Sequence, residues 1–261
     1  MATTLRTDHL LAEERRLLIV DWTRKDGRLD AGMAAKKLSV ATETVRRDLD
    51  VLERRGVLRR VHGGAIALER FTREYTIPER ENIHPDAKRR IAETASRYLP
   101  QEGSVFVDGG TTTEQLAPYL RNRPKLQVVT NNLRLVTAIG DSGTKVHVLA
   151  GSVRPTTLSS IGPRTVEDLR DLNAVAAFIG ANGVSADLKI TAFDNDEAVV
   201  KRQMIRNAEE AILLADNSKF GATYHATFAG AADIDRVVSD VDTASEYVQR
   251  LTAADVEVVL A

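Results

Sequence analysis

SVATETVRRDLDVLERRG, residues 39–56, is the stretch that decides the fold of the first part of the chain. Apolar residues recur in it at the spacing of one helical face, which predicts a helix over residues 42–55 packed through that face. These apolar residues are Val45, Leu49 and Leu52. Gly56 follows, and glycine commonly ends a helix. The adjacent Arg46 and Arg47 then lie away from the packed face.

Two further helices and a hairpin surround this segment. Apolar residues at helical spacing predict a first helix that Gly27 ends and a short second helix over residues 31–38. The apolar residues of the first helix are Leu10, Leu11, Leu17, Leu18 and Trp22. The sequence VLRRVHGGA, residues 57–65, predicts a hairpin with a glycine turn. Three helices followed by a hairpin predict a winged helix-turn-helix domain over residues 1–66.

The outward surface of the third helix and of the hairpin suits DNA. Arginine binds guanine through two hydrogen bonds in the major groove, or binds a phosphate without reading sequence. Basic side chains of the hairpin would lie near the flanking DNA backbone. The candidate DNA-binding residues are Thr42, Thr44, Arg46, Arg47, Arg59, Arg60 and His62. The alternative is a solvated amphipathic helix whose arginines pair with Asp48 and Glu53.

The distribution of charge agrees with this division. The chain has 261 residues, with 36 basic and 37 acidic side chains. Residues 1–66 contain 14 of the basic and 10 of the acidic ones, which leaves 22 against 27 for the remainder. A basic module joined to an acidic one is typical of a DNA-binding domain attached to a sensor, although chance variation of a solvated surface gives the same pattern.

Composition excludes several classes of protein. The absence of cysteine excludes a disulfide framework, a thiolate nucleophile and a Cys-ligated metal site, and the five histidines show no metal-ligand spacing. No apolar run approaches the length of a membrane span, and the charged residues 13–16 interrupt the N-terminal apolar segment. We therefore expect a cytoplasmic protein with no membrane partner, no metal and no cofactor.

The rest of the chain has a different pattern. Residues 67–85 mix charges with two prolines and are interpreted as a linker. Over residues 86–261, apolar strands alternate with helices, which predicts a mostly parallel sheet covered on both faces. The expected strands are 104–108, 127–130, 145–150, 174–179, 211–215, 236–239 and 257–260. The expected helices are 86–98, 112–121, 133–139, 164–169, 196–208 and 243–251. The fold class is therefore α/β, with the small winged helix-turn-helix domain followed by a larger Rossmann-like α/β effector-binding domain.

VFVDGGTTT, residues 105–113, predicts a strand, a glycine turn and a helix start. Free N–H groups at such a turn favour an anion, and glycines let a phosphate approach the backbone. A plain turn with a threonine cap has the same pattern. Polar residues also follow other strands, and ligands of open parallel sheets bind beyond the carboxyl ends of the strands. The chain has neither a Walker lysine at this turn nor a G-x-G-x-x-G motif, so neither ATP nor a dinucleotide is indicated.

Motifs in both parts of the chain resemble the DeoR family of bacterial transcriptional regulators. They are SVATETVRRDL at 39–49, RVHGGA at 60–65 and the strand-end motifs of the second part, so that the resemblance covers essentially the whole chain. Ala41 departs from it, because the family often has a helix-capping serine there, and so does Asn182, where an aspartate is common. The resemblance implies a sensor domain similar in fold to ribose-5-phosphate isomerases that binds a phosphorylated sugar or polyol.

The resemblance also implies roles for single residues. Residues 109–112 would hold the phosphate with Lys219, while Asp108, Asn131 and Arg154 would face the sugar hydroxyls or the phosphate. Thr191, with Glu197 and Lys201, matches a lid or rim segment of the family. The expected effector-binding residues are Asp108, Gly109, Gly110, Thr111, Thr112, Asn131, Arg154, Gly180, Asn182, Thr191 and Lys219.

The main alternative function is a sugar-phosphate isomerase. Such an enzyme needs an acid/base carboxylate beside its substrate. The isomerases that the domain resembles carry acidic residues after a Gly-Ala turn and a Lys-Gly-Gly loop, but this chain has Asn182-Gly183 at the first place and lacks the second. A sensor that no longer binds DNA is disfavoured by the arginine pair. We therefore expect no catalytic residue, and a homodimeric or homotetrameric repressor of sugar or polyol catabolism genes that binds double-stranded operator DNA.

Overall fold

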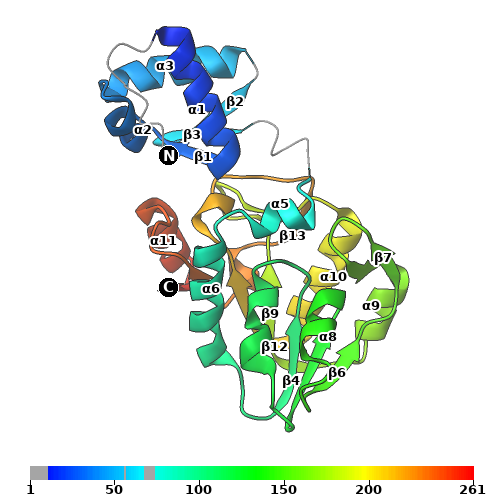
Figure 1. Cartoon of the computed structure of the whole chain (residues 1–261). Coiled ribbons are helices and arrows are strands. Elements are labelled where there is room, and N and C mark those ends of the chain that lie inside the picture. The colour runs from blue at the N-terminus through cyan, green and yellow to red at the C-terminus, as the bar shows by residue number, and fades with distance from the viewer. Residues whose placement is uncertain (1–10, 56, 68–73) are drawn as a thin grey trace. The chain divides into compact units, whose positions relative to one another are not determined.

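The helices and strands of the computed structural model, which describes residues 11–55, 57–67 and 74–261, belong to two units (Figure 1). The chain divides between Glu74 and Tyr75. The expected linker, residues 67–85, therefore spans this division. Its residues 68–73 lie outside the described part of the chain, and its second half contains the short helix α5, Ile77–Glu81.

The first unit has the element order of a winged helix-turn-helix. Its elements are α1 (Ala12–Asp26), β1 (Arg28–Asp30), α2 (Ala31–Leu38), α3 (Thr42–Arg54), β2 (Leu58–Val61) and β3 (Gly64–Ala67). The three strands pair antiparallel in the order β1-β3-β2, so the predicted hairpin gains β1 as a third strand. Gly27 ends α1 with a φ of 72°, a conformation that glycine adopts without strain.

The core of this unit lies where the three helices meet. As predicted, α3 buries Val45, Leu49 and Leu52. The interpretation of α1 needs correction, because Leu11 and Leu17 are 71% and 69% exposed, whereas Ile19 is fully buried. Leu18 and Trp22 do pack against the core, and Leu10 lies outside the described residues, so the helical spacing identified only part of the packed face of α1. The start of α3 at Ala41 has no side-chain cap, as the sequence indicates.

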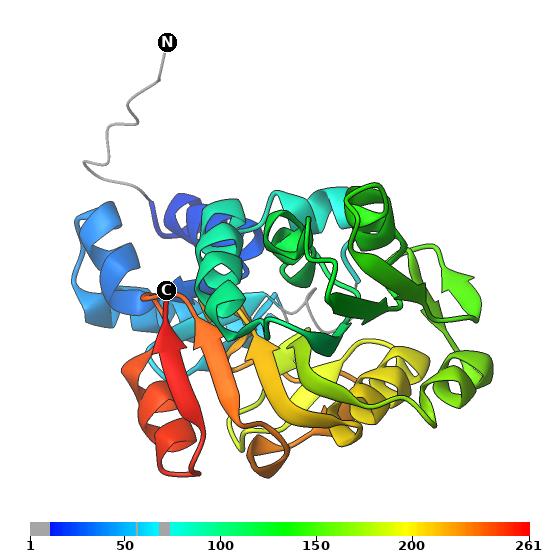
Figure 2. The same cartoon turned by 90° about the horizontal axis from the view of Figure 1, so that it is seen from below.

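The second unit is built on a parallel sheet of seven strands. They are β4 (Gly103–Val107), β5 (Leu126–Thr130), β6 (Lys145–Val148), β9 (Ala174–Gly180), β12 (Ala208–Leu214), β14 (Arg236–Ser239) and β15 (Glu257–Leu260). Their order across the sheet is β15-β14-β12-β9-β4-β5-β6. In Figure 2 the red, orange and yellow arrows of β15, β14 and β12 lie side by side. All seven strands match strands expected from the sequence.

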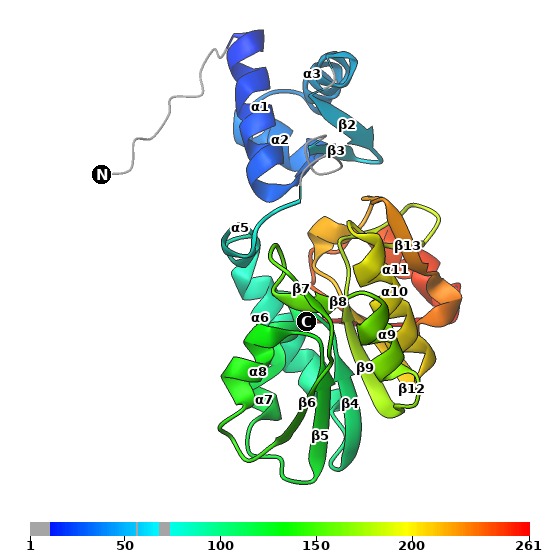
Figure 3. The ribbon, with the colours of Figure 1, turned by 90° about the vertical axis from the view of Figure 1, so that its right-hand side faces the viewer.

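Helices cover both faces of this sheet, as Figure 3 shows. One face packs against α6 (Pro85–Ala95), α7 (Ala117–Leu120) and α8 (Leu133–Ile139). The other packs against α9 (Pro163–Leu169), α10 (Asn195–Arg206) and α11 (Ser245–Thr252). Alternate residues of one strand serve the two cores, since Val105 and Val107 face the first and Phe106 the second.

Short strands outside the main sheet were not predicted. β7 (Ser152–Arg154) and β8 (Ser159–Ile161) form a hairpin, while β10 (Gly183–Val184), β11 (Ile190–Ala192) and β13 (Ala226–Ala229) form a small antiparallel sheet. The described part of the chain also contains four short 3-10 helices, η1 (Ser96–Tyr98), η2 (Thr113–Leu116), η3 (Asn217–Lys219) and η4 (Ala231–Asp233). No helix in the described ranges is both long and apolar enough to cross a membrane.

A lysine is buried in α6 among these elements. Lys88 is 3% exposed, and its ammonium donates a hydrogen bond to the Arg80 carbonyl. Burial, together with repulsion from Lys219, lowers the pKa of Lys88 from 10.5 to about 8. The folded protein therefore releases this proton at a lower pH than the unfolded chain does.

Lys88 makes the stability of the second unit depend on pH. Below about pH 8 both states hold the proton. Between pH 8 and 10.5 the unfolded chain binds more protons, so this group raises the free energy of unfolding as pH rises, by about 3 kcal/mol in all. We expect Lys88→Met to abolish that rise in denaturant titrations across this range, whereas Lys145→Met, at an exposed lysine of β6, should keep it. Parallel pH profiles for wild type and Lys88→Met would contradict the assignment.

Candidate functional site

The outward face of α3 carries the predicted arginine pair. Arg46 and Arg47 have side chains that are 57% and 79% exposed. Both lie within 3.8 Å of the Glu43 carboxylate, one turn earlier on the same helix. They do not pair with Asp48 or Glu53, as the solvated-helix alternative supposed, because Asp48 is 2% exposed and bonded to α1, and Glu53 accepts a hydrogen bond from the Arg60 N–H. Exposed pairs of this length are weak, so a DNA phosphate or base can compete with Glu43.

The remaining candidates for DNA binding lie beside this arginine pair or on the hairpin of β2 and β3, which is the wing of the domain. Thr42 and Thr44 are half-buried on the first turn of α3. Arg59 and His62 are exposed on and after β2. Arg60 is exposed too, but its guanidinium is paired with Asp50 of α3. The wing is therefore tied to the helix by two contacts from one residue, the ion pair to Asp50 and the backbone bond to Glu53.

In the second unit, a cleft opens at the carboxyl ends of β4 and β9. It contains about 440 Å³ of space between atoms, part of it open to solvent. Its lining brings together seven of the eleven expected effector-binding residues. These are Gly109, Gly110, Thr111, Thr112, Gly180, Asn182 and Lys219. The segments that carry them are far apart in sequence, and the parallel sheet brings their ends to one edge.

The glycine turn supplies backbone donors to this cleft. The N–H groups of residues 109–112 make no hydrogen bond with any described residue, which leaves them available to an anion. The Thr113 hydroxyl closes the turn by donating to the carbonyls of Asp108 and Gly110. The expected helix over 112–121 is instead η2 followed by the four-residue α7, so these donors belong to a turn rather than to the end of a long helix.

Close packing requires glycine at position 109. A Cβ added there would lie 2.0 Å from the Ser159 hydroxyl oxygen and 3.6 Å from the Asn131 side-chain oxygen. β8, which carries Ser159, thus presses against the turn. Asn131 is 2% exposed, donates to the Ser160 carbonyl and has no described hydrogen-bond partner for Oδ1. It supports the turn from beneath rather than lining the cleft.

Asp108 also lies beneath the cleft, in an ion pair with Lys201 of α10. Its carboxylate accepts hydrogen bonds from the Lys201 ammonium and, at 3.1 Å, from the Gly180 N–H. Both side chains are at least 95% buried. Burial raises the pKa of Asp108 above its ordinary value, and Lys201 acts in the opposite direction. Lys201 itself reaches the cleft wall.

Two other expected residues are bonded within the protein. Arg154 of β7 lies 3.4 Å from carboxylate oxygens of both Asp194 and Glu197 at the start of α10. Thr191 of β11 is fully buried, where its hydroxyl donates to the Gly183 carbonyl and accepts the Tyr224 N–H. Arg154 can therefore act on the cleft through Glu197, which lines it.

The cleft also contains residues outside the predicted set. These are Arg80, Thr113, Ala181, Glu197 and Lys201. Arg80 lies on α5, inside the expected linker, and its guanidinium donates to the Thr156 carbonyl. A signal for α5 was present, because Thr76 and Glu79 form a capping box with Pro78 on the first turn. Three of the four charged side chains of the lining are cationic, namely Arg80, Lys201 and Lys219 against Glu197, and of these Lys201 is ion-paired with Asp108 beneath the cleft.

Lys219 is held beside a buried acid. Asp216, fully buried, precedes η3 and accepts a hydrogen bond from the Ser218 N–H. Burial alone would raise the pKa of Asp216, but the ammonium of Lys219 and the hydrogen bond with Ser218, with smaller effects of His84 and Lys88, outweigh burial, and the pKa lies below its ordinary value. Asp216 therefore stays ionised beside Lys219.

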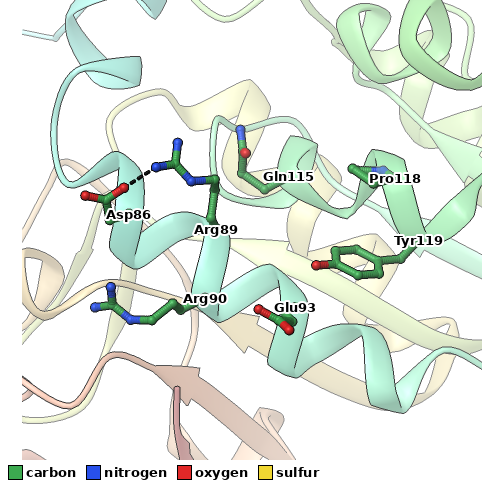
Figure 4. A pocket seen from close by; sticks show the side chains of 7 residues that line it. All are labelled: Asp86, Arg89, Arg90, Glu93, Gln115, Pro118 and Tyr119. Atoms are coloured by element: carbon green, nitrogen blue, oxygen red, sulfur yellow. Dashed lines mark hydrogen bonds and ion pairs between the residues drawn. The ribbon is translucent and has the colours of Figure 1, made fainter.

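A second hollow lies on the outer surface, between α6 and the η2–α7 segment (Figure 4). Its charged side chains have both signs, and Asp86 pairs with Arg89 across one turn of α6. None of the expected site residues lines it. In the described part of the chain, no group of three or more acidic or histidine side chains is arranged to hold a metal ion.

Comparison with known proteins places both units. Residues 15–71 match the DeoR-like helix-turn-helix domain, and residues 83–241 match the DeoR C terminal sensor domain. A Bacillus subtilis protein named uncharacterized HTH-type transcriptional regulator FruR is 32% identical over 89% of this chain and 93% of its own length. The Escherichia coli glycerol-3-phosphate regulon repressor is 28% identical over 90% of this chain and 93% of its own.

A solved structure, ribose 5-phosphate isomerase A from Methanocaldococcus jannaschii, has a TM-score of 0.39 at 16% identity. The match covers 52% of this chain and 54% of that one. A similarity of this degree carries no conclusion about activity. The family assignment rests instead on the two domain matches and on the long match to FruR, because together they span both units. The chain belongs to the DeoR family of transcriptional regulators.

Proposed function

We propose that the chain is a cytoplasmic repressor of sugar or polyol catabolism genes. It binds double-stranded operator DNA through α3 and the wing, and a phosphorylated sugar or polyol in the cleft controls that binding. The observation that carries the proposal is the outward arginine pair on a helix whose opposite face is buried. The name of the Escherichia coli relative, a glycerol-3-phosphate regulon repressor, supports the class of regulated gene.

The DNA contacts follow from the exposure of the candidates. Arg46 and Arg47 enter the major groove, where each can form paired hydrogen bonds with guanine. Thr42, Thr44, Arg59, Arg60 and His62 contact the flanking backbone, which adds affinity without sequence preference. Two copies of the chain read two half-sites, as a homodimer or homotetramer, because one recognition helix spans too few base pairs for a specific operator.

The effector contacts follow from the lining of the cleft. The N–H groups of residues 109–112 and the side chains of Thr111, Thr112 and Lys219 hold the phosphate. Gly180 and Asn182 face the hydroxyl-bearing end. Asp108, Asn131, Arg154 and Thr191 act from beneath or beside the cleft, where they fix the residues that touch the effector. The effector lowers operator affinity to the extent that it binds the DNA-incompetent state more tightly.

Removing the arginine pair tests the DNA surface. We expect Arg46→Ala with Arg47→Ala to weaken operator binding at least about thirtyfold, which corresponds to about 2 kcal/mol, because two sets of guanine contacts are lost. Gel shifts on the upstream region of the chain's own gene measure this. The matched control is Arg164→Ala with Arg170→Ala, two exposed arginines of α9 and its C-terminal end, which remove the same charge. Equal affinity for wild type and the α3 variant would refute the recognition helix.

Removing cleft donors tests the effector site. A panel of sugar and polyol phosphates should contain one compound that raises the melting temperature of the wild-type chain by about 5 °C or more at saturating concentration. We expect Lys219→Ala with Thr111→Ala to lose that rise, because an ammonium and a hydroxyl that hold the phosphate are gone. Lys145→Ala, at an exposed lysine of β6, should retain it. A full rise in the double variant would place the phosphate elsewhere.

A further inference from the structure

Five charged side chains join α1 to α3 in the first unit. We name this group, Glu13, Arg15, Arg16, Asp48 and Arg55, the α1–α3 clamp. At its centre is Asp48, which is 2% exposed. Arg15 Nε lies 2.5 Å from one oxygen of its carboxylate, and Arg16 Nε lies 2.9 Å from the other. The outer members pair through Glu13, which contacts Arg16 at 2.7 Å and Arg55 at 2.9 Å.

Asp48 belongs to the buried face of α3. Along a helix of 3.6 residues per turn it lies beside Val45, Leu49 and Leu52, and Arg46 and Arg47 lie on the other side. Apolar contacts on the buried face have no preferred direction, so they allow a helix to rotate or slide slightly. Hydrogen bonds are directional. A carboxylate with each oxygen held by a different arginine removes that freedom.

The second point of the clamp lies further along the helix. Arg55 follows Asp48 by seven residues, about 10 Å along the axis. Because Arg55 and Glu13 are exposed, their pair adds little stability, but together with Asp48 it restrains the tilt of α3 as well as its rotation. The N-terminal end of α3 lacks a capping side chain at Ala41, so the clamp holds a helix whose start is unrestrained by a cap.

We infer that Arg15 and Arg16 are positioning residues for sequence recognition: through Asp48 they set the angle at which α3 presents Arg46 and Arg47 to the major groove. The inference rests on the proposed function of α3. A stabilising role alone explains the cluster poorly, because burying an ion pair costs desolvation free energy. Well-packed apolar residues in the same place often stabilise a fold equally well or better. Reading a base edge, in contrast, requires donors fixed in both distance and direction.

Substituting lysine for both arginines separates geometry from charge. Lysine keeps the positive charge but is a single point of charge without the planar fork of arginine. The probes are a duplex that the wild-type chain enriches from a random-sequence pool and a scrambled duplex of the same length and composition. For Arg15→Lys with Arg16→Lys we expect affinity for the enriched duplex to fall at least tenfold. Affinity for the scrambled duplex, and the slope of binding against salt, should stay within twofold of wild type.

Two companions complete the test. Arg89→Lys with Arg90→Lys, on α6, makes the same chemical change outside the clamp and should leave both affinities unchanged. Asp48→Asn removes the centre of the clamp and one negative charge, so it should weaken binding to the enriched duplex while scrambled-duplex binding holds or tightens. Circular dichroism and thermal melting monitor folding, and if Asp48→Asn does not fold, the lysine variant decides.

The outcomes separate the possibilities. Loss confined to the enriched duplex supports the positioning role. Unchanged affinity of the lysine variant for the enriched duplex overturns it, and so do equal losses on both duplexes, which would show only a smaller folded fraction. If the wild-type chain enriches no duplex, the assignment of α3 as a recognition helix fails first, and the positioning role fails with it.

Discussion

The ion pair between Asp108 and Lys201 is the interaction on which the cleft of the second unit depends. The pair lies at the ends of β4 and β9, beside α10, and it links these three elements. The Asp108 carboxylate accepts a hydrogen bond from the Gly180 N–H, and the Lys201 ammonium donates to the Asp108 carboxylate and to the Gly180 carbonyl. A single unpaired charge buried there would lower the stability of the fold strongly, so removal of either partner alone would disturb this edge of the sheet. The glycine turn follows Asp108 directly, so this ion pair fixes the position of the turn.

The parts of the fold that the sequence predicted are those with long apolar patterns. The inner strands of the main sheet, such as β4 and β9, are largely buried on both faces and appear as apolar runs, which are visible without tertiary information. The edge strands β6 and β15 are only partly buried. The strands of the β7–β8 hairpin and of the small sheet formed by β10, β11 and β13 have only two to four residues each. Strands this short carry too little pattern for the local sequence to indicate them, and the pairing of β11 with β13 depends besides on a partner that is distant in the chain.

The sequence indicated which residue types form the candidate site, but it did not indicate whether each side chain faces the cleft or the protein interior. Glycines and threonines after a strand indicated the turn, and seven expected residues do line the cleft. A polar residue can equally face inward, as Asn131 does after β5 and Thr191 does within β11, where each satisfies backbone groups. Arg80 was missed for a different reason: two prolines and several charges made its segment resemble a linker, although a capping box starts a helix there. Local sequence indicates which residues can bind, and packing decides which of them reach the ligand.

The pairing of Arg60 with Asp50 has a consequence for the thermodynamics of DNA binding. A protein cation that neutralises a DNA phosphate releases the cation that had condensed there, and this release of mobile ions gives binding entropy. Arg60 is neutralised by a carboxylate of its own protein instead. If it moves to a phosphate, Asp50 loses its partner and must acquire a counterion, so the exchange releases almost no net ions. Arg60 can thus add a contact to the complex without making it more sensitive to ionic strength, and the number of basic residues on the surface overstates the number of ions that binding sets free.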